Sequence, residues 1–475
     1  MLRDNQYDAI VVGAGPNGLA AAITLIRKKH SVLLIEAEET LGGGTRTKEL
    51  TLPDFHHDVC SAIHPLALAS PFFRSIDLST YGLRWIEPPI SLAHPLDGEN
   101  AVLLERSVDV TADGLGEDAN NYRRLIGPCV RNWEYLVQEL LKPLSAPRHP
   151  FVLMKFGLLA MRSAIALARD RFGNKRARAL FAGNAAHSIQ PLDRWSSAAF
   201  GLMLPTLGHA VGWPIAEGGS QAIATALASF FKSMGGTIQL ETTISSIDDL
   251  PKTGAVLFDV TPRQLARLAG HKFSRAYRKK LENHNHGPGV FKVDWALKAP
   301  VPWKDAACSK AATLHIGGTL EEIATAEGDA WKEIAPEKPF VFFVQPSLFD
   351  RTRAPEGMHT AWGYCHVPNG CTVDMTNRIE AQIERFAPGF RQTIIARHLM
   401  SPADMEAYNP NYIGGDIVGG SQSFANLFLR PLGRWRAYST PVKGVYICSS
   451  SMPPGGGVHG MCGYLAAKCA LHDVF

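Results

Sequence analysis

The chain has 475 residues, of which 46% are hydrophobic and 19% are charged, and its formal net charge is +4. This length predicts two or three domains with sizeable cores, and so weak a positive charge gives no reason to expect nucleic acid as a partner. The 8 cysteines form no CxxC pair and no zinc spacing, so we expect reduced structural thiols and no bound metal.

The N-terminal apolar run "YDAIVVG" is too short for a signal peptide and leads directly into a glycine loop. No uninterrupted run of about 18 apolar residues occurs, so the sequence predicts no membrane span. We therefore expect a cytoplasmic protein.

The first motif has the order strand, GxGxxG loop, helix, strand and acid, at residues 9–12, 13–18, 19–29, 31–35 and 36. Gly15 would let a pyrophosphate approach the backbone, and the helix N-terminus would offer it free N–H groups. Glu36 would accept hydrogen bonds from ribose hydroxyls. The predicted cofactor contacts of this motif are Gly13, Gly15, Pro16, Asn17, Gly18, Glu36 and Ala37.

A glycine run in "AEETLGGGTRTKEL" follows Glu36 within a few residues. In this position it resembles FAD enzymes of the glutathione-reductase type, and among these the amine-oxidase and phytoene-desaturase branch. The resemblance implies that Gly43, Gly44, Thr45 and Arg46 lie close to the pyrophosphate. The alternative is an ordinary surface loop.

Residues 151–178 are apolar with regularly placed bases. Lys155, Arg162 and Arg169 recur every seven residues, which predicts one basic face on a helix. This helix could lie on an anionic membrane surface as a peripheral contact, or it could be a domain helix with a solvated basic face. Further on, "GNAAHS" predicts a helix on which His187 either faces the flavin or is a hydrogen-bonded core histidine.

The segment "GWPIAEGGSQAIATALASFFKSMGGTIQLETTISSID" predicts loop, helix and strand, followed by the strand of "AVLFDV". In the resembled branch such a stretch adds strands to the FAD domain and supplies backbone contacts to the adenine, which here implies Ile244.

The last motif, "KGVYICSSSMPPGGGVHGMCGYLAAKCAL", repeats the order strand, glycine turn and helix, with the helix expected from Val458. In the resembled branch this loop contacts the flavin, so both glycine loops would serve one cofactor, FAD. The implied contacts are Ser450, Pro454, Gly456, Gly457, Val458 and His459. Serines replace the acid that usually binds the ribityl chain. His459 either faces the flavin or points outward.

Nearly the whole chain resembles bacterial flavoproteins related to phytoene dehydrogenases. The resemblance implies an α/β fold with a glutathione-reductase-type, Rossmann-like FAD-binding domain and an inserted α+β substrate domain. The FAD domain would be discontinuous, with the substrate domain made by a mostly helical insertion and a strand-rich one; the ranges are 1–75, 210–275 and 405–475, then 76–209 and 276–404.

We therefore expect an FAD-dependent oxidoreductase that removes hydride from a largely apolar, isoprenoid-like small molecule, with His459 and His187 as candidate catalytic residues. A redox-neutral reduced-flavin isomerase and a non-catalytic flavin-binding partner or assembly protein are the alternatives. The sequence names neither the substrate, the electron acceptor nor the oligomeric state.

Overall fold

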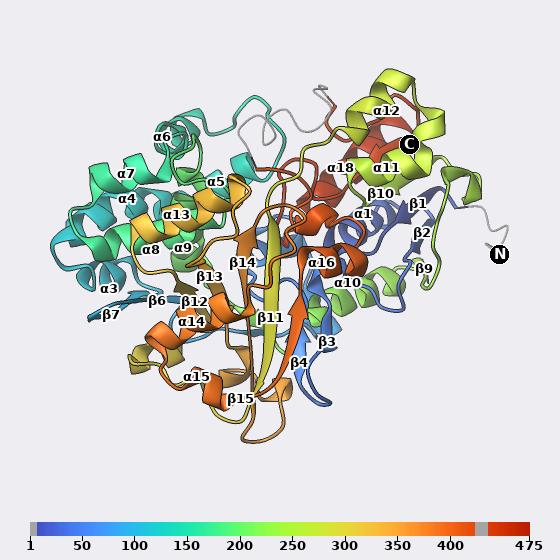
Figure 1. The fold of residues 1–475 in the computed structure, drawn as a ribbon. Coiled ribbons are helices and arrows are strands. Elements are labelled where there is room, and N and C mark those ends of the chain that lie inside the picture. The colour runs from blue at the N-terminus through green and yellow to red at the C-terminus, as the bar shows by residue number, and fades with distance from the viewer. Residues whose placement is uncertain (1–6, 423–435) are drawn as a thin grey trace.

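The computed structural model describes residues 7–422 and 436–475. Two sheets dominate it, and helices from the middle of the chain cover one face of the second sheet (Figure 1). The first sheet is parallel, in the order β16-β10-β1-β2-β9. Its strands are β1 (Ala9–Val12), β2 (Val32–Ile35), β9 (Thr237–Gln239), β10 (Ala255–Phe258) and β16 (Val445–Ile447). Four of them, β1, β2, β10 and β16, are fully buried, as is usual in a parallel sheet covered on both faces.

Beside this sheet, α1 (Pro16–Ile26) contacts two other helices, α10 (Gln221–Ser233) and α18 (Met461–Asp473). A Cβ on Gly18 would lie 1.9 Å from the Gly13 carbonyl oxygen, and one on Gly463 would lie 1.8 Å from that of Asn17. Gly18 therefore lets α1 pack closely on the first glycine loop, and Gly463 lets α18 pack closely on the start of α1.

The second sheet has seven strands in the order β15-β11-β14-β13-β12-β6-β7. All neighbours are antiparallel except β12 and β6. The strands are β6 (Leu92–Leu96), β7 (Glu99–Leu104), β11 (Gly289–Leu297), β12 (Thr313–Ile316), β13 (Val341–Val344), β14 (His359–Val367) and β15 (Ile394–Met400). The range 76–209 thus contributes two strands to this sheet.

Helices from the middle of the chain form a separate core with β6, β7 and β13. They are α3 (Val108–Asp113), α4 (Ala119–Arg131), α5 (Trp133–Leu140), α6 (Pro150–Ala160), α7 (Ala164–Arg171), α8 (Lys175–Ala186), α9 (Ala198–Ala210) and α13 (Leu320–Trp331). The remaining longer helices and the short strands are β3 (Thr47–Glu49), β4 (His56–Asp58), α2 (Pro65–Ala69), β5 (Trp85–Ile86), β8 (Ile215–Ala216), α11 (Pro262–Ala269), α12 (Arg275–Glu282), α14 (Thr376–Phe386), α15 (Phe390–Thr393) and α16 (Pro402–Tyr408).

The expected single basic helix over 151–178 is wrong. The segment is divided into α6, α7 and the start of α8, and α6 and α7 are bent by 95°. The chain changes direction near Ser163, whose side chain accepts a hydrogen bond from the Ala166 N–H and so caps the N-terminus of α7. In the part of the chain that the structure describes, no single helix has the length and apolar composition to cross a membrane, and only the bent pair α6–α7 meets both criteria together.

Candidate active site

A cavity of about 560 Å³ lies where the two sheets meet. It is lined by the glycine loop after β1, the run after β2, the turn after β10 and the last glycine loop. The predicted cofactor contacts that line it are Gly13, Gly15, Pro16, Asn17, Glu36, Ala37, Gly43, Gly44, Thr45, Arg46, Ile244, Ser450, Gly456, Gly457 and Val458. The two glycine loops, at opposite ends of the sequence, therefore open onto one space.

Three predicted contacts do not line the cavity: Gly18, Pro454 and His459. Gly18 lies behind the loop, where it allows α1 to approach the turn. α1 begins at Pro16, before the expected Leu19, because proline is favoured in the first turn of a helix.

The first two glycine segments touch each other. Gly43 has a φ of +52°, and a Cβ there would lie 3.3 Å from the Gly15 Cα atom. A side chain at either position would fill the space between the loop and the run. Because both residues are glycines, the main chain of the two segments lines the cavity without side chains, and its N–H groups can bind a pyrophosphate.

Glu36 follows β2 and accepts hydrogen bonds from three groups. Its Oε2 accepts one from the Ala14 N–H at 2.8 Å, and its Oε1 accepts one from Arg46 Nη2 at 3.2 Å and one from the Glu38 N–H at 3.2 Å. Arg46 also donates to the Thr40 carbonyl at 2.9 Å. The carboxylate is thus fixed in the cavity wall, and Oε2 keeps a lone pair that can accept a ribose hydroxyl.

A second buried carboxyl, Asp259, lies at the end of β10 beside the glycine loop. Its Oδ2 accepts a hydrogen bond from the Gly18 N–H at 2.8 Å, and a Cβ on Gly15 would lie 2.9 Å from the same oxygen. Burial, with a smaller contribution from Glu36, raises the pKa of Asp259 to about 7 against the effect of the Gly18 hydrogen bond. Asp259 therefore occupies one N–H of the helix terminus that faces the cofactor.

His459 does not face the cavity, which contradicts a catalytic role. Its Nδ1 accepts a hydrogen bond from the Met461 N–H at 3.0 Å, and its Nε2 donates to the Gly455 carbonyl at 3.1 Å. Both ring nitrogens thus hold the loop in shape. The expected helix start at Val458 is also wrong, because Gly460 has a φ of +65° and α18 begins at Met461.

The serines of the last loop have different positions. Ser449 and Ser450 line the cavity, whereas the Ser451 hydroxyl donates to the Gly419 carbonyl at 2.6 Å. Three side-chain oxygens of the cavity wall are buried without a hydrogen-bond partner: Asn17 Oδ1, Thr261 Oγ1 and Ser449 Oγ. Buried polar atoms are normally satisfied. These three therefore fit the polar groups of a dinucleotide, with Ser449 in the place of the missing acid.

Beyond the loops the cavity has aromatic walls from the second sheet. Tyr364 stacks on Phe342 with ring centroids 4.7 Å apart and an interplanar angle of 12°, and on Trp362 at 6.1 Å and 20°. Phe200 and Leu204 from α9 complete this wall.

The charged residues that line the cavity, Glu36, Glu38, Arg46 and Asp259, all belong to the cofactor end. The buried pair of Lys292 and Asp294 lies behind the wall, with Lys292 Nζ 4.9 Å from the Trp362 ring centroid. The substrate end of the cavity is therefore uncharged over the described residues.

His187 lies at the end of α8 and lines the cavity. Its Nε2 is 2.9 Å from His315 Nε2, and its ring packs against Phe342 at 4.6 Å. Burial, followed by the charge of His366, lowers the pKa of His187 to about 3, so the ring is neutral. His187 is thus a hydrogen-bonded histidine, as one sequence interpretation expected, and it also lines the cavity.

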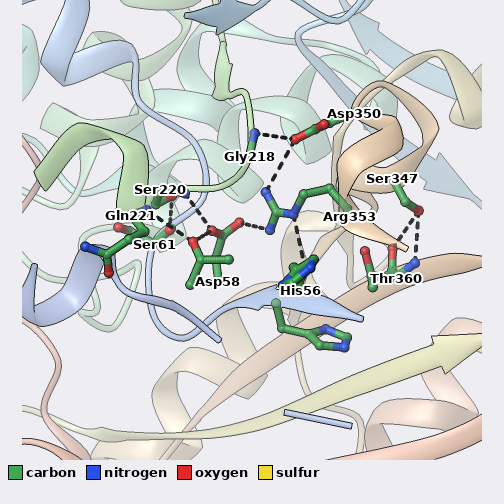
Figure 2. Close-up of polar contacts among 12 residues, drawn as sticks. His56, Asp58, Ser61, Gly218, Ser220, Gln221, Ser347, Asp350, Arg353 and Thr360 are labelled. Atoms are coloured by element: carbon green, nitrogen blue, oxygen red, sulfur yellow. Dashed lines mark hydrogen bonds and ion pairs between the residues drawn. The ribbon is translucent and has the colours of Figure 1, made fainter. Parts of the chain in front are cut away.

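A buried ion pair joins Asp58 on β4 to Arg353, which lies between β13 and β14 (Figure 2). Arg353 donates to Asp58 Oδ2 at 2.6 Å and to the His56 carbonyl at 3.1 Å. Asp58 Oδ1 accepts from the Ser220 N–H at 2.8 Å, just before α10. Burial opposes ionisation of Asp58, but Arg353 and the other donors hold its pKa below its ordinary value.

Several residues of the site could not be found from the sequence. His64, Asp259 and the aromatic residues Phe342, Trp362 and Tyr364 carry no motif, and they meet only because β13, β14 and the loops after β4 and β10 converge. Over residues 7–422 and 436–475, no cluster of His, Cys, Asp or Glu has the arrangement of a metal site.

Comparison with known proteins agrees with this geometry. Residues 11–74 match the family model described as NAD(P)-binding Rossmann-like domain. The chain is 24% identical to pyridine nucleotide-disulfide oxidoreductase domain-containing protein 2 of Mus musculus, over 99% of this chain and 94% of the mouse protein. It is 26% identical to the phytoene desaturase (neurosporene-forming) of Rhodobacter capsulatus, over 96% of this chain and 92% of the desaturase.

Among solved structures, putrescine oxidase bound to putrescine matches with a TM-score of 0.62 and 16% identity, over 98% of this chain and 99% of the oxidase. Together the matches confirm the α/β fold with a Rossmann-like domain of the FAD-dependent oxidoreductases, and they confirm FAD as the predicted cofactor. The chain is homologous along its length to the mouse and Rhodobacter proteins.

Proposed function

We propose that this FAD-dependent oxidoreductase oxidises an uncharged, largely apolar small molecule of isoprenoid type. The observation that supports this most directly is the cavity itself, which runs from the glycine loops to a wall of aromatic and aliphatic side chains. Bound FAD would supply hydride-accepting chemistry. Gly15, Gly43, Glu36 and Ser449 would hold it at one end, and the rings of the second sheet would exclude water at the other.

The absence of charge at the substrate end argues against an amine cation as substrate. A buried ammonium group needs a carboxylate or several acceptors around it. Among the described lining residues the carboxylates lie at the cofactor end, where they face the glycine loops. Burial of a hydrocarbon chain, in contrast, would stabilise binding by about 0.8 kcal/mol per CH₂.

The test is anaerobic reduction of the bound flavin by a matched panel: geraniol and myrcene as neutral isoprenoids, and putrescine as a dication. We expect at least one neutral compound to bleach the flavin absorbance stoichiometrically, and putrescine to leave it unchanged. Bleaching by putrescine alone would contradict the proposal. Mass spectrometry of the cofactor released on denaturation, expected to be FAD, serves as the control for loading.

We also propose that α6 contacts an anionic membrane surface. Phe151, Met154 and Leu158 lie on one face of α6 and are 75%, 54% and 70% exposed. Lys155 is exposed on the same helix, and α6 packs on α9, whose Phe200 and Leu204 line the cavity. Such a face would bring an apolar substrate close to its site.

Vesicle co-sedimentation tests this contact. We expect binding to vesicles of phosphatidylglycerol and phosphatidylcholine, and loss of most of it when Phe151, Met154 and Leu158 are all replaced by serine. A matched triple replacement of exposed residues elsewhere, Val110, Ile334 and Ile395, should leave it unchanged. Equal sedimentation of the two triple variants would contradict the membrane contact.

A further inference from the structure

His64 lies between β4 and α2 and lines the cavity. Its side chain is almost completely buried, with 1% of the residue exposed. The ring is 5.8 Å from Trp85, and its Nε2 is 2.8 Å from Ser220 Oγ. Its other nitrogen, Nδ1, is enclosed and has no hydrogen-bond partner in the described protein. An unsatisfied ring nitrogen in a cavity wall is expected to meet a group of the bound molecule.

The hydrogen bonds around Ser220 determine which nitrogen of His64 carries the proton. Ser220 has one hydroxyl proton, and it donates that proton to the Ser61 carbonyl at 2.6 Å (Figure 2). Ser220 Oγ can therefore only accept from His64, so His64 Nε2 must be the protonated nitrogen. It follows that Nδ1 carries a lone pair and can only accept a hydrogen bond in the neutral ring.

The electrostatic surroundings keep His64 neutral at rest, and Asp58 offsets part of the cost of a positive charge on the ring. Burial lowers the pKa of His64 to about 4, while the carboxylate of Asp58 opposes that shift. Asp58 accepts from the Ser220 N–H and from Arg353, which keeps it ionised beside the imidazole. The positive charge of a ring protonated on Nδ1 would thus be partly stabilised by a nearby carboxylate that is already fixed in place.

We propose that His64 Nδ1 accepts first the hydrogen bond and then the proton of a substrate hydroxyl, so that the substrate is an apolar alcohol. This inference rests on the proposed function and narrows its substrate class. Oxidation of an alcohol to a carbonyl breaks one C–H and one O–H bond and forms the second C–O bond. The hydride goes to the flavin oxidant of the proposed function, and the proton goes to His64. Ser220 acts as a positioning residue because it fixes the tautomer.

The first experiment reads the tautomer directly, in holoprotein labelled with ¹⁵N-histidine. We expect His64 to be protonated at Nε2 and unprotonated at Nδ1, with no change across the neutral pH range. Replacing Ser220→Ala removes the acceptor but keeps the N–H that binds Asp58, so the resonances should become those of a tautomer mixture. A protonated Nδ1 in the unaltered protein, or no effect of Ser220→Ala, would overturn the inference.

The second experiment compares 1-octanol with octane as probes. Saturating 1-octanol should move the His64 Nδ1 resonance and octane should not, and His64→Phe should reduce the preference for octanol over octane about tenfold. A resonance that moves only when FAD is added to apoprotein would assign Nδ1 to the cofactor and overturn the inference. Failure of the proposed function would be seen separately, as missing FAD or as flavin reduction by putrescine alone.

Discussion

The two ends of the cavity are built by different means. The cofactor end consists of short loops, each directly following a strand of the parallel sheet, and it presents main chain, small residues and fixed charges. The substrate end consists of rings from β13, β14, α8 and α9, and its histidines are neutral. Charge is thus kept where a phosphate-containing cofactor lies and removed where an apolar molecule would bind. The ion pair of Asp58 on β4 and Arg353, between β13 and β14, belongs to neither end (Figure 2).

The largest expected effect comes from a substitution that blocks cofactor binding and does not alter the substrate end. A valine side chain at position 15 would overlap Asp259 Oδ2 and fill the space between residues 15 and 43, where the pyrophosphate would lie. We expect FAD affinity to fall at least about 100-fold in Gly15→Val. Fluorescence titration of apoprotein with FAD measures this. Gly328→Val, on α13 with only the end of Lys332 nearby, is the control and should bind FAD normally.

The ion pair of Asp58 and Arg353, outside both ends, should give the next largest effect. Arg353→Met leaves Asp58 buried without its cation, and an unpaired buried charge costs about 3–5 kcal/mol of unfolding free energy. Urea denaturation measures the loss. The double variant Arg353→Met with Asp58→Asn removes both charges and should recover part of it. A double variant as unstable as the single one would show that the ion pair itself does not matter.

A pH experiment tests whether ionisation of a buried carboxyl at the cofactor end destabilises the folded protein when no cation pairs with it. Because the folded pKa of Asp259, about 7, lies above its ordinary value of 3.8, folding favours the protonated form. The stability from this group is complete below the ordinary value and is lost as pH rises toward 7, by up to about 4 kcal/mol.

Asp259→Asn keeps an acceptor for the Gly18 N–H but cannot ionise. We therefore expect the variant apoprotein to be more stable than the unaltered one at about pH 8, and nearly equal to it at about pH 4. Chemical denaturation at both pH values measures the difference. A constant difference between the two proteins at both values would contradict the assignment.

The smallest expected effect is at the substrate end. A Cβ on Gly183 would lie 2.6 Å from His315 Nδ1 and 3.1 Å from His94 Nδ1, so Gly183→Ala should displace the histidines behind His187. We expect a loss of about 1–3 kcal/mol in unfolding free energy, with unchanged FAD affinity. Gly157→Ala, in α6 with open space around it, is the control and should be neutral or slightly stabilising. Lost FAD affinity in Gly183→Ala would show that the two ends are not independent.

The sequence by itself determined the first motif of the cofactor end. Its strands, glycine loop and Glu36 follow one another along the chain, and its contacts are local or made by main chain, so spacing predicts them. The pairing of the first and last glycine loops came from the resemblance to FAD enzymes, and Asp259, which carries no motif, was missed. The errors there were local: His459 turned into its own loop, and α18 began after Gly460 rather than at Val458.

Only the tertiary structure decided the substrate end. His64 lies between two short elements with no motif, and its role depends on Ser220, 156 residues away in sequence. His187 was found as a candidate, but its neutral state follows from burial in the folded protein, with a smaller effect of His366 on β14. The tautomer of a histidine and the pKa of a buried group depend on partners from distant strands. The spacing of residues in the sequence does not show which strands will become neighbours. It therefore does not show the charges and hydrogen bonds that surround a residue after folding.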